Sequence, residues 1–141
     1  MAQPAYFNRT YDETLTLMVE ARNYFRHNER VERGRAEPVI GLRMSCEAMR
    51  VTSRLTQVMA WLMVQRAVQS GELSPEEALE SERRLSGWDV CLDDSFGADE
   101  TLPRGLRSLM DRSHRLFVRV ARLEAMLIDR MAVNYGSGSL N

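Results

Sequence analysis

The side chains that most often carry chemistry are few in this chain and stand apart from one another. Its two histidines, His27 and His114, are distant in sequence, and neither has a cysteine at the spacing of a metal site. Cys46 and Cys91 form no disulfide framework or zinc pattern. We therefore predict no metal-binding residues and expect both cysteines to be reduced thiols.

The charged residues and the glycines exclude several further classes of enzyme. All 19 basic residues are arginine, so no lysine is available for a Schiff base or a P-loop. The GxSxG and nucleotide-binding glycine motifs are absent as well. Asp93–Asp94 and Asp99–Glu100 are adjacent acids, but their polar segment offers no buried setting for acid–base catalysis. We predict no catalytic residue and no cofactor.

Three long amphipathic segments must position whatever surface the protein uses instead. Apolar residues recur every three or four positions over residues 11–30, 38–70 and 103–133, which predicts three α-helices. A capping-box pattern from Thr10 to Glu13 predicts where the first of them begins. No strand is expected.

The intervening stretches are polar and rich in helix-breaking residues. Residues 30–37 have almost nothing to bury and are interpreted as a loop. Ser74, followed by proline and two glutamates, predicts a short helix over residues 75–86. Residues 88–102 are interpreted as a mobile acidic loop, and residues 134–141 have the composition of a frayed tail.

Length and composition favour one folded unit. The chain has 141 residues, 44% of them hydrophobic, and fits a single domain over 1–141. We predict an all-α, three-helix bundle with a long central helix, an extra short helix, and an acidic loop before the third long helix.

Two apolar stripes run along the central helix, which we interpret as packing against two neighbouring helices. The first stripe consists of Leu42, Cys46, Met49, Ser53, Thr56, Ala60 and Met63. The second stripe consists of Ala48, Val51, Leu55, Met59 and Leu62.

Charge is segregated along the sequence although the net charge is only −1. Residues 72–100 carry ten acids and two arginines, whereas residues 104–130 carry seven arginines and three acids. A basic ridge is expected on the third helix, away from its leucine seam. The ridge residues that we select as candidate partner-binding residues are Arg112, Arg115, Arg119 and Arg122. The ridge is either a solvated face, a surface for an acidic partner, or a docking strip for the acidic loop.

Trp61 lies in the middle of the expected polar face of the central helix. That face carries Arg43, Glu47, Arg50, Arg54, Gln57 and Gln65. A tryptophan there is unfavourable unless something covers it. Either Tyr6, Phe7 or the short helix covers it within the chain, or it forms a partner-contact surface. The members of that second candidate surface are Arg50, Arg54, Gln57 and Trp61.

Two segments carry a resemblance to a known family. The run RLTQVMAWLMVQRAV, which spans residues 54–68, closely resembles a segment of the alphaproteobacterial RcdA family, the regulators of CtrA degradation. The run RLFVRVARLE, residues 115–124, is similar to that family as well. The layout of helices and acidic loop agrees across residues 8–133. The short tail is a departure, because the family often has a longer C-terminal extension.

The resemblance implies a three-helix-bundle homodimer that acts as a proteolytic adaptor rather than an enzyme. Its implied cargo is a regulatory protein such as a CtrA-like transcription factor. Its implied partners are the ClpX-type unfoldase of the ClpXP protease and a response-regulator-like priming factor. We expect a cytoplasmic location, because no run is apolar enough for a membrane span and the first residues lack the pattern of a secretory signal. The resemblance additionally implies a cell pole.

Two other function classes stay open at this point. An all-helical enzyme of the chorismate mutase type would clamp a dicarboxylate with arginines, although such sites also use lysine, which this chain lacks. A regulator that binds nucleic acid through the ridge is disfavoured by the near-neutral charge. No membrane association is expected, because no run approaches the roughly 18 apolar residues of a membrane span.

Overall fold

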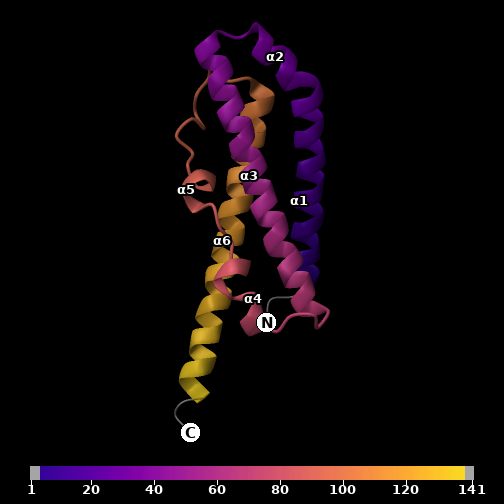
Figure 1. The fold of residues 1–141 in the computed structure, drawn as a ribbon, viewed down its shortest axis with the longest axis vertical. Helices are drawn as coiled ribbons and strands as arrows, with labels where there is room; N and C mark the ends of the chain where they lie inside the picture. The colour runs from indigo at the N-terminus through magenta and orange to yellow at the C-terminus, as the bar shows by residue number, and fades with distance from the viewer. Residues whose placement is uncertain (1–3, 139–141) are drawn as a thin grey trace.

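Three long helices run side by side along the length of the molecule (Figure 1). The computed structural model describes residues 4–138, with side chains for residues 6–136, and contains no strand within that range. The helices are α1 (Pro4–Tyr24), α3 (Pro38–Gln69) and α6 (Arg104–Gly138). Because α3 packs against both α1 and α6, the predicted all-α bundle with a long central helix is confirmed.

The first helix begins earlier than the capping pattern predicted. Thr10 lies inside α1 and is buried, and its hydroxyl donates to the Tyr6 carbonyl at 3.1 Å. Thr14 repeats this contact one turn later, on the Thr10 carbonyl at 2.7 Å. Both hydroxyls therefore satisfy the carbonyl four residues back, which is how a threonine inside a helix is accommodated. The capping box at Thr10 was wrong.

The loop predicted over residues 30–37 is mostly helix. After α1 the chain continues through a π-helical turn, Phe25–Glu29, and α2, Arg30–Arg35, so only two residues separate α2 from α3. Glu29 is buried, and Arg33 pairs with its carboxylate at 3.2 Å. The sequence interpretation was wrong because this polar helix continues directly from the helix before it and is held by polar contacts, the Arg33–Glu29 ion pair and a hydrogen bond from Tyr24 to Glu32, rather than by an apolar face.

Helix α3 has the predicted extent, and its two ends have the expected signals. Pro38 occupies the first turn, where its missing N–H costs no hydrogen bond. Past the C-terminus, Gly71 adopts a φ of 81°, and its N–H donates to the Val68 carbonyl at 3.2 Å. The Glu72 N–H donates to the Ala67 carbonyl at 2.9 Å. Together these bonds form a Schellman motif that requires a left-handed residue.

The connection from α3 to α6 is more broken than predicted. Ser74 caps α4, Pro75–Ala78, with the full capping box, but the helix ends well before residue 86. A 3₁₀ turn, Ser81–Arg83, follows it. The chain then turns inward to bury Leu85, whose N–H donates to the Glu124 carboxylate at 2.7 Å. The helix predicted over residues 75–86 is therefore correct at its start and wrong beyond Ala78.

The acidic stretch over residues 88–102 also departs from the expected structureless loop. It contains the short helix α5, Trp88–Cys91, and lies along α3 and α6 (Figure 1). At the other end of the chain, α6 continues through residues 134–138, which were predicted as tail. No proline interrupts those residues, so the helix persists despite its glycines. Residues 139–141 lie outside the described part of the chain.

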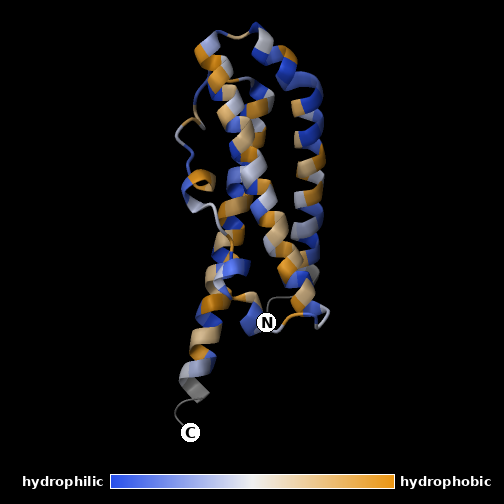
Figure 2. Ribbon diagram, in the orientation of Figure 1, coloured by the Kyte–Doolittle hydropathy of each residue, from blue (hydrophilic) through white to orange (hydrophobic). Residues whose placement is uncertain are grey.

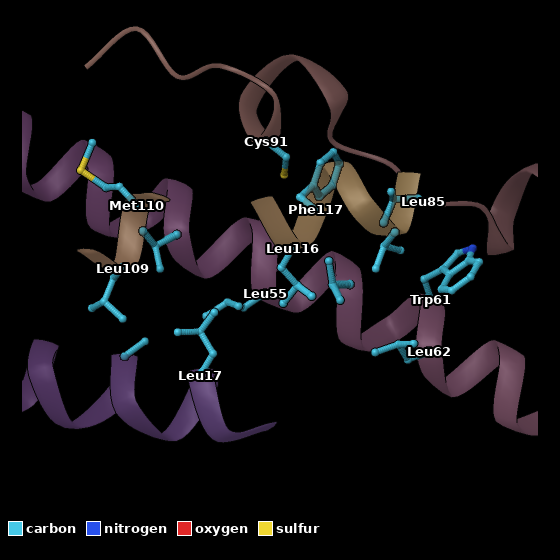
Figure 3. Packing of buried hydrophobic residues seen from close by; sticks show 14 of the residues in the cluster. Leu17, Leu55, Trp61, Leu62, Leu85, Cys91, Leu109, Met110, Leu116 and Phe117 are labelled. Atoms are coloured by element: carbon cyan, nitrogen blue, oxygen red, sulfur yellow. The ribbon is translucent and has the colours of Figure 1, made fainter. Parts of the chain in front are cut away.

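The core fills the space between the three long helices (Figure 3). Trp61, Leu62, Phe117 and Leu109 are among its largest fully buried side chains. Along the ribbon, apolar and polar residues alternate on every long helix (Figure 2). None of the helices in the described range is long and apolar enough to cross a membrane.

Of the two apolar stripes on α3, only the second faces the core. Val51, Leu55 and Leu62 from that stripe are buried. In the first stripe, Met49 is 71% exposed and Leu42 is 66% exposed. The prediction that both stripes pack within the chain is therefore wrong. The side of α3 that faces the α5 segment and α6 is instead the one expected to be polar.

Candidate interaction surfaces

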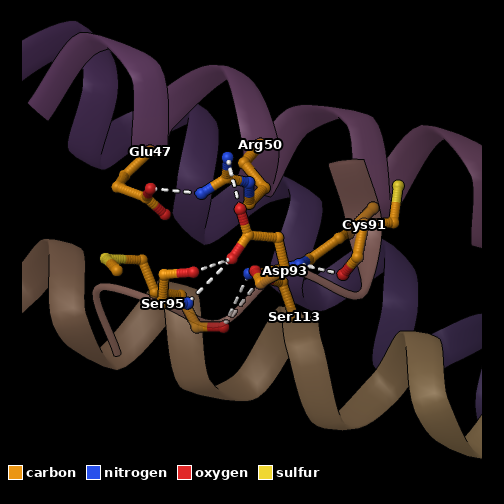
Figure 4. A network of polar contacts seen from close by, with 8 residues as sticks. Glu47, Arg50, Cys91, Asp93, Ser95 and Ser113 are labelled. Carbon is orange, nitrogen blue, oxygen red and sulfur yellow. Dashed lines mark hydrogen bonds and ion pairs between the residues drawn. The ribbon is translucent and has the colours of Figure 1, made fainter. Parts of the chain in front are cut away.

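Arg54 lies at the centre of a buried polar network between α3, α5 and α6. Figure 4 shows the residues around it, including Cys91, Asp93 and Ser113. Only 1% of the residue is exposed. Its Nε donates to the Cys91 carbonyl at 2.8 Å, and its Nη2 donates to the Asp93 carbonyl at 2.6 Å. Its Nη1 reaches the Met110 carbonyl at 3.0 Å and the Ser113 hydroxyl at 3.3 Å. The guanidinium therefore joins the acidic segment to two long helices.

Arg50 and Glu47 extend this network along α3. Arg50 pairs with the Glu47 carboxylate and, through Nη2, with Asp93 Oδ2 at 3.3 Å. Burial raises the pKa of Glu47, while Arg50 and Arg54 oppose that shift. The pKa of Asp93 is lowered, chiefly by hydrogen bonds from the side chain and backbone of Ser95. Two arginines thus hold one end of the acidic segment on α3.

The far end of the acidic segment is held in a similar way. Arg43 donates to Asp99 Oδ2 at 3.3 Å, and its guanidinium lies 5.2 Å from the centre of the Phe96 ring. The acidic segment therefore docks on the arginines of α3. The alternative in which it docks on the α6 ridge is wrong.

Trp61 is covered within the chain. It is 2% exposed, and the Phe7 ring meets it edge-on with 5.8 Å between centroids. Leu85, from the connection after α4, lies nearby (Figure 3). Gln57 accepts hydrogen bonds from the Ser86 hydroxyl and N–H at 2.8 and 3.2 Å. Arg54 and Trp61 are inaccessible, so the partner-contact surface expected around them is corrected to an internal anchor for the connecting segments.

The ridge on α6 faces carboxylates of α1. Arg112 binds Glu20 in a bidentate manner, with Nη1–Oε2 at 2.8 Å and Nη2–Oε1 at 2.6 Å. Two helical turns further along α6, Arg119 Nη2 lies 2.5 Å from Glu13 Oε2. The hydrogen bond from Arg112 lowers the pKa of Glu20 and raises that of the arginine. These two pairs tie together the helices that share the smallest contact in the bundle.

The other two ridge arginines are more exposed to solvent. Arg115 is 69% exposed at its side chain and pairs only with Asp111, four residues earlier on the same helix. Arg122 is exposed, and no ion pair with it is found among residues 6–136. All four ridge arginines line an open groove of about 710 Å3 between α1 and α6. The structure thus brings Arg112, Arg115, Arg119 and Arg122 together at one surface.

The groups considered for chemistry remain apart in the fold. Within the described chain, no three His, Cys, Asp or Glu residues are placed to hold a metal ion. Cys91 is buried, and burial raises the pKa of its thiol despite the opposing charges of Arg54 and Arg50. His27 is exposed, while His114 Nε2 lies 3.2 Å from the Leu92 carbonyl.

Comparison with known proteins agrees with this architecture. Residues 1–138 match the family described as "Protein of unknown function (DUF1465)". The crystal structure of RcdA from Caulobacter crescentus CB15 is 34% identical in sequence and superimposes with a TM-score of 0.71. That similarity covers 89% of this chain and 93% of the RcdA chain. The chain belongs to the RcdA family. No curated protein matches the sequence at a significant level.

The sequence interpretation of this RcdA family member missed the residues that pair with its arginines. Glu13 and Glu20 are seven residues apart on α1, and Arg112 and Arg119 are seven apart on α6. Equal spacing of opposite charges on two antiparallel helices could have predicted this pairing. The carbonyl acceptors of Arg54 left no signal in the sequence, because any residue type supplies a carbonyl.

Proposed function

We propose that this protein is a non-enzymatic adaptor that helps deliver regulatory proteins to the ClpXP protease. The observation that carries the proposal is its relation to RcdA over nearly the whole chain. An adaptor of this kind accelerates degradation by holding cargo near the protease, which raises the effective concentration of the cargo. It needs accessible surfaces on a stable scaffold and no reactive group of its own.

The α6 ridge is the proposed contact for an acidic partner. Arg115 and Arg122 are exposed beside an open groove, and guanidinium groups bind carboxylates with defined geometry. Arg112 and Arg119 line the same groove but already hold Glu20 and Glu13. The proposed partners are a CtrA-like transcription factor as cargo and a ClpX-type unfoldase with a response-regulator-like priming factor. A homodimer is the proposed working form.

A reconstituted degradation assay tests the proposal. Purified ClpXP, the priming factor and a CtrA-like cargo are mixed with and without this protein, and loss of cargo is followed on gels. We expect degradation to be faster when the protein is present. Co-purification from the native cytoplasm with a proteolytically inactive ClpP trap identifies cargo independently. Equal degradation rates with and without the protein, together with no enrichment of cargo in the trap, would reject the adaptor function.

The role of the ridge is tested by charge reversal at its exposed members. Arg115→Glu/Arg122→Glu should slow degradation and weaken capture of the acidic partner, because neither side chain supports the core. Arg26→Glu/Arg35→Glu is the matched control, since both residues are exposed and lie off the ridge. Circular dichroism checks that all variants remain helical. Equal loss in both double variants would show that net charge alone matters and would remove the ridge from the proposal.

A further inference from the structure

A second groove lies between α4 and the C-terminal half of α6, at the end of the bundle that holds the first turns of α1 (Figure 1). Its volume is about 670 Å3, which is within the usual range for a ligand site. The most deeply buried residues that line it are Phe7 of α1, Gln65 of α3 and Ala78 of α4, each 5% exposed. The half-buried apolar residues of its walls are Val68, Leu79, Leu127 and Met131. We call it the α4–α6 groove.

Gln65 brings an unused hydrogen-bond donor to this groove. Its amide nitrogen Nε2 is buried and has no hydrogen-bond partner within residues 6–136. Such a donor is unfavourable, because the amide has lost its contact with water and gained nothing in exchange. A ligand that offers an acceptor at the floor of the groove would remove this penalty.

Arg130 supplies a positive charge at the edge of the groove. The residue is exposed, and no ion pair with it is found in the part of the chain whose side chains are described. Glu76 lines the opposite wall, on α4, and is exposed as well. An acidic ligand group would be attracted to the α6 side and repelled from the α4 side. The groove therefore favours an apolar ligand that carries a single acid next to α6.

We infer that the α4–α6 groove binds an extended apolar segment of a partner protein that carries one acidic side chain beside its apolar residues. The apolar side chains contact the walls, one backbone carbonyl accepts from Gln65 Nε2, and the acid pairs with Arg130. The segment is extended because its carbonyls are then free, whereas carbonyls inside a helix are already bonded. This site shares no residue with the groove beside the α6 ridge, and it goes beyond the proposed function because it does not depend on delivery to ClpXP.

The depth of the two polar groups decides against other ligands with a carboxylate. A fatty acid would match the apolar walls and Arg130, but its hydrocarbon chain has no acceptor for the buried amide of Gln65. A C-terminal carboxylate inserted to the level of Gln65 would be buried without a cation, since Arg130 lies at the exposed edge. The acid is therefore a side chain at the edge, where the partner chain leaves the groove.

Fluorescence anisotropy with labelled peptides tests the site. Two probes have the same short run of alternating leucine and alanine between uncharged glycine–serine ends, with an amidated C-terminus. One probe has an aspartate before the run and the other has it after the run. Each has a counterpart with lysine in place of the aspartate. We expect one of the aspartate probes to bind, about fivefold more tightly than its lysine counterpart.

Two variants test the two polar contacts. Arg130→Glu should reverse the preference, so that the lysine counterpart binds more tightly than the aspartate probe. Gln65→Leu should weaken both by about fivefold, because it removes the donor and leaves the groove apolar. Arg122→Glu is the matched control, since it reverses another exposed arginine of α6 that lies outside this groove, and it should leave binding unchanged. Circular dichroism checks that all variants remain helical.

The same titrations give the outcomes that would overturn the inference. No binding of any probe to the wild type, or equal loss in Arg130→Glu and Arg122→Glu, would remove the groove as the site. Unchanged binding in Gln65→Leu would overturn the carbonyl contact and with it the extended segment. Displacement of the probe by decanoate at lower concentration than by unlabelled peptide would make the groove a fatty-acid site. No protease is present, so these results are independent of the degradation assay.

Discussion

At the scale of single residues, Arg54 matters most for the stability of the fold. It is a buried cation to which no carboxylate is directly bound. Arg54 is satisfied by three backbone carbonyls and one hydroxyl. Desolvation lowers the pKa of its guanidinium, and the nearby Glu47 opposes that effect. A planar group with five donors in fixed directions can reach acceptors on three elements at once. A lysine ammonium could not span the same set of acceptors.

Replacing Arg54 should therefore destabilise the whole fold. We expect Arg54→Met to lower the free energy of unfolding by about 3–5 kcal/mol, because it leaves buried carbonyls without donors. Arg54→Lys should recover only part of the loss. Urea denaturation measures the effect, and Arg35→Met, at an exposed position on α2, is the control. An Arg54→Met variant as stable as the wild type would contradict the anchoring role.

Trp61 should behave as a core residue. Trp61→Ala removes the contact with Phe7 and leaves a cavity, so we expect a loss of about 3–5 kcal/mol in unfolding free energy. Trp88→Ala should cost less than half as much, because Trp88 is 40% exposed even though it stacks edge-on with Phe117. Thermal unfolding of the two variants provides the comparison. Similar melting temperatures would place Trp61 outside the core.

At the scale of elements, α3 is the case in which the sequence pattern misleads. Its length, its first-turn proline and its C-terminal glycine were predictable from local chemistry. Its inward face was predictable only in part, because the second apolar stripe is buried, but the helix also buries Glu47, Arg54 and Gln65 and exposes the first apolar stripe. Hydrophobic periodicity finds a stripe but cannot tell an intramolecular neighbour from one on another copy. Arg54 can be buried because the α5 segment and α6 supply its acceptors, and Glu47 can be buried because it pairs with Arg50 on the same helix.

The ends of the other helices were less predictable for a related reason. The α2 segment lacks an apolar face, which favours a loop, and residues 134–138 contain glycines, which favour a tail. Both are helical extensions of neighbouring helices and need no nucleation of their own. Among the candidate residues, the four α6 ridge arginines line one groove, and the carboxylates across from them were missed.

Alanine substitutions at two glycines test these assignments, one inside α2 and one just past the C-terminus of α3. Gly34 lies in α2, and no heavy atom of another part of the chain lies within 4 Å of the point that an alanine Cβ would occupy. Gly34→Ala should therefore raise the unfolding free energy by about 0.5–1 kcal/mol. Gly71→Ala should lower it by about 1–2 kcal/mol, because Gly71 has a φ of 81°. Chemical denaturation measures both variants. Destabilisation by Gly34→Ala would argue that this segment is a loop after all.

At the scale of the whole molecule, ion pairs close the bundle where apolar contact is smallest. Helices α1 and α6 each pack mainly on α3 and meet each other through Glu20–Arg112 and Glu13–Arg119. These side chains remain between 36% and 49% exposed, so solvent screens their attraction. Their contribution should depend on both salt and pH.

A double-mutant cycle on Glu20→Gln and Arg112→Gln should give a coupling of about 0.5–1 kcal/mol at pH 7 and low salt. The folded-state pKa of Glu20 lies below its ordinary 4.5, so its stabilising contribution is present above that value. The contribution is lost as the pH falls through the lowered folded-state pKa. Unfolding free energies measured between pH 7 and pH 3, and in 1 M salt, should show the coupling shrinking. A coupling that stays constant over this range would contradict the ion pair.

The same pairs decide what an acidic ligand would encounter on the ridge. Two of its four guanidinium groups already hold a carboxylate from α1. A carboxylate of a bound ligand would have to displace Glu13 or Glu20 at those positions. The net free energy of binding there would be the small difference between two similar ion pairs. Such competition favours weak binding and fast dissociation of an acidic ligand. The carboxylates of α1 would thereby help to set the residence time of that ligand on the ridge.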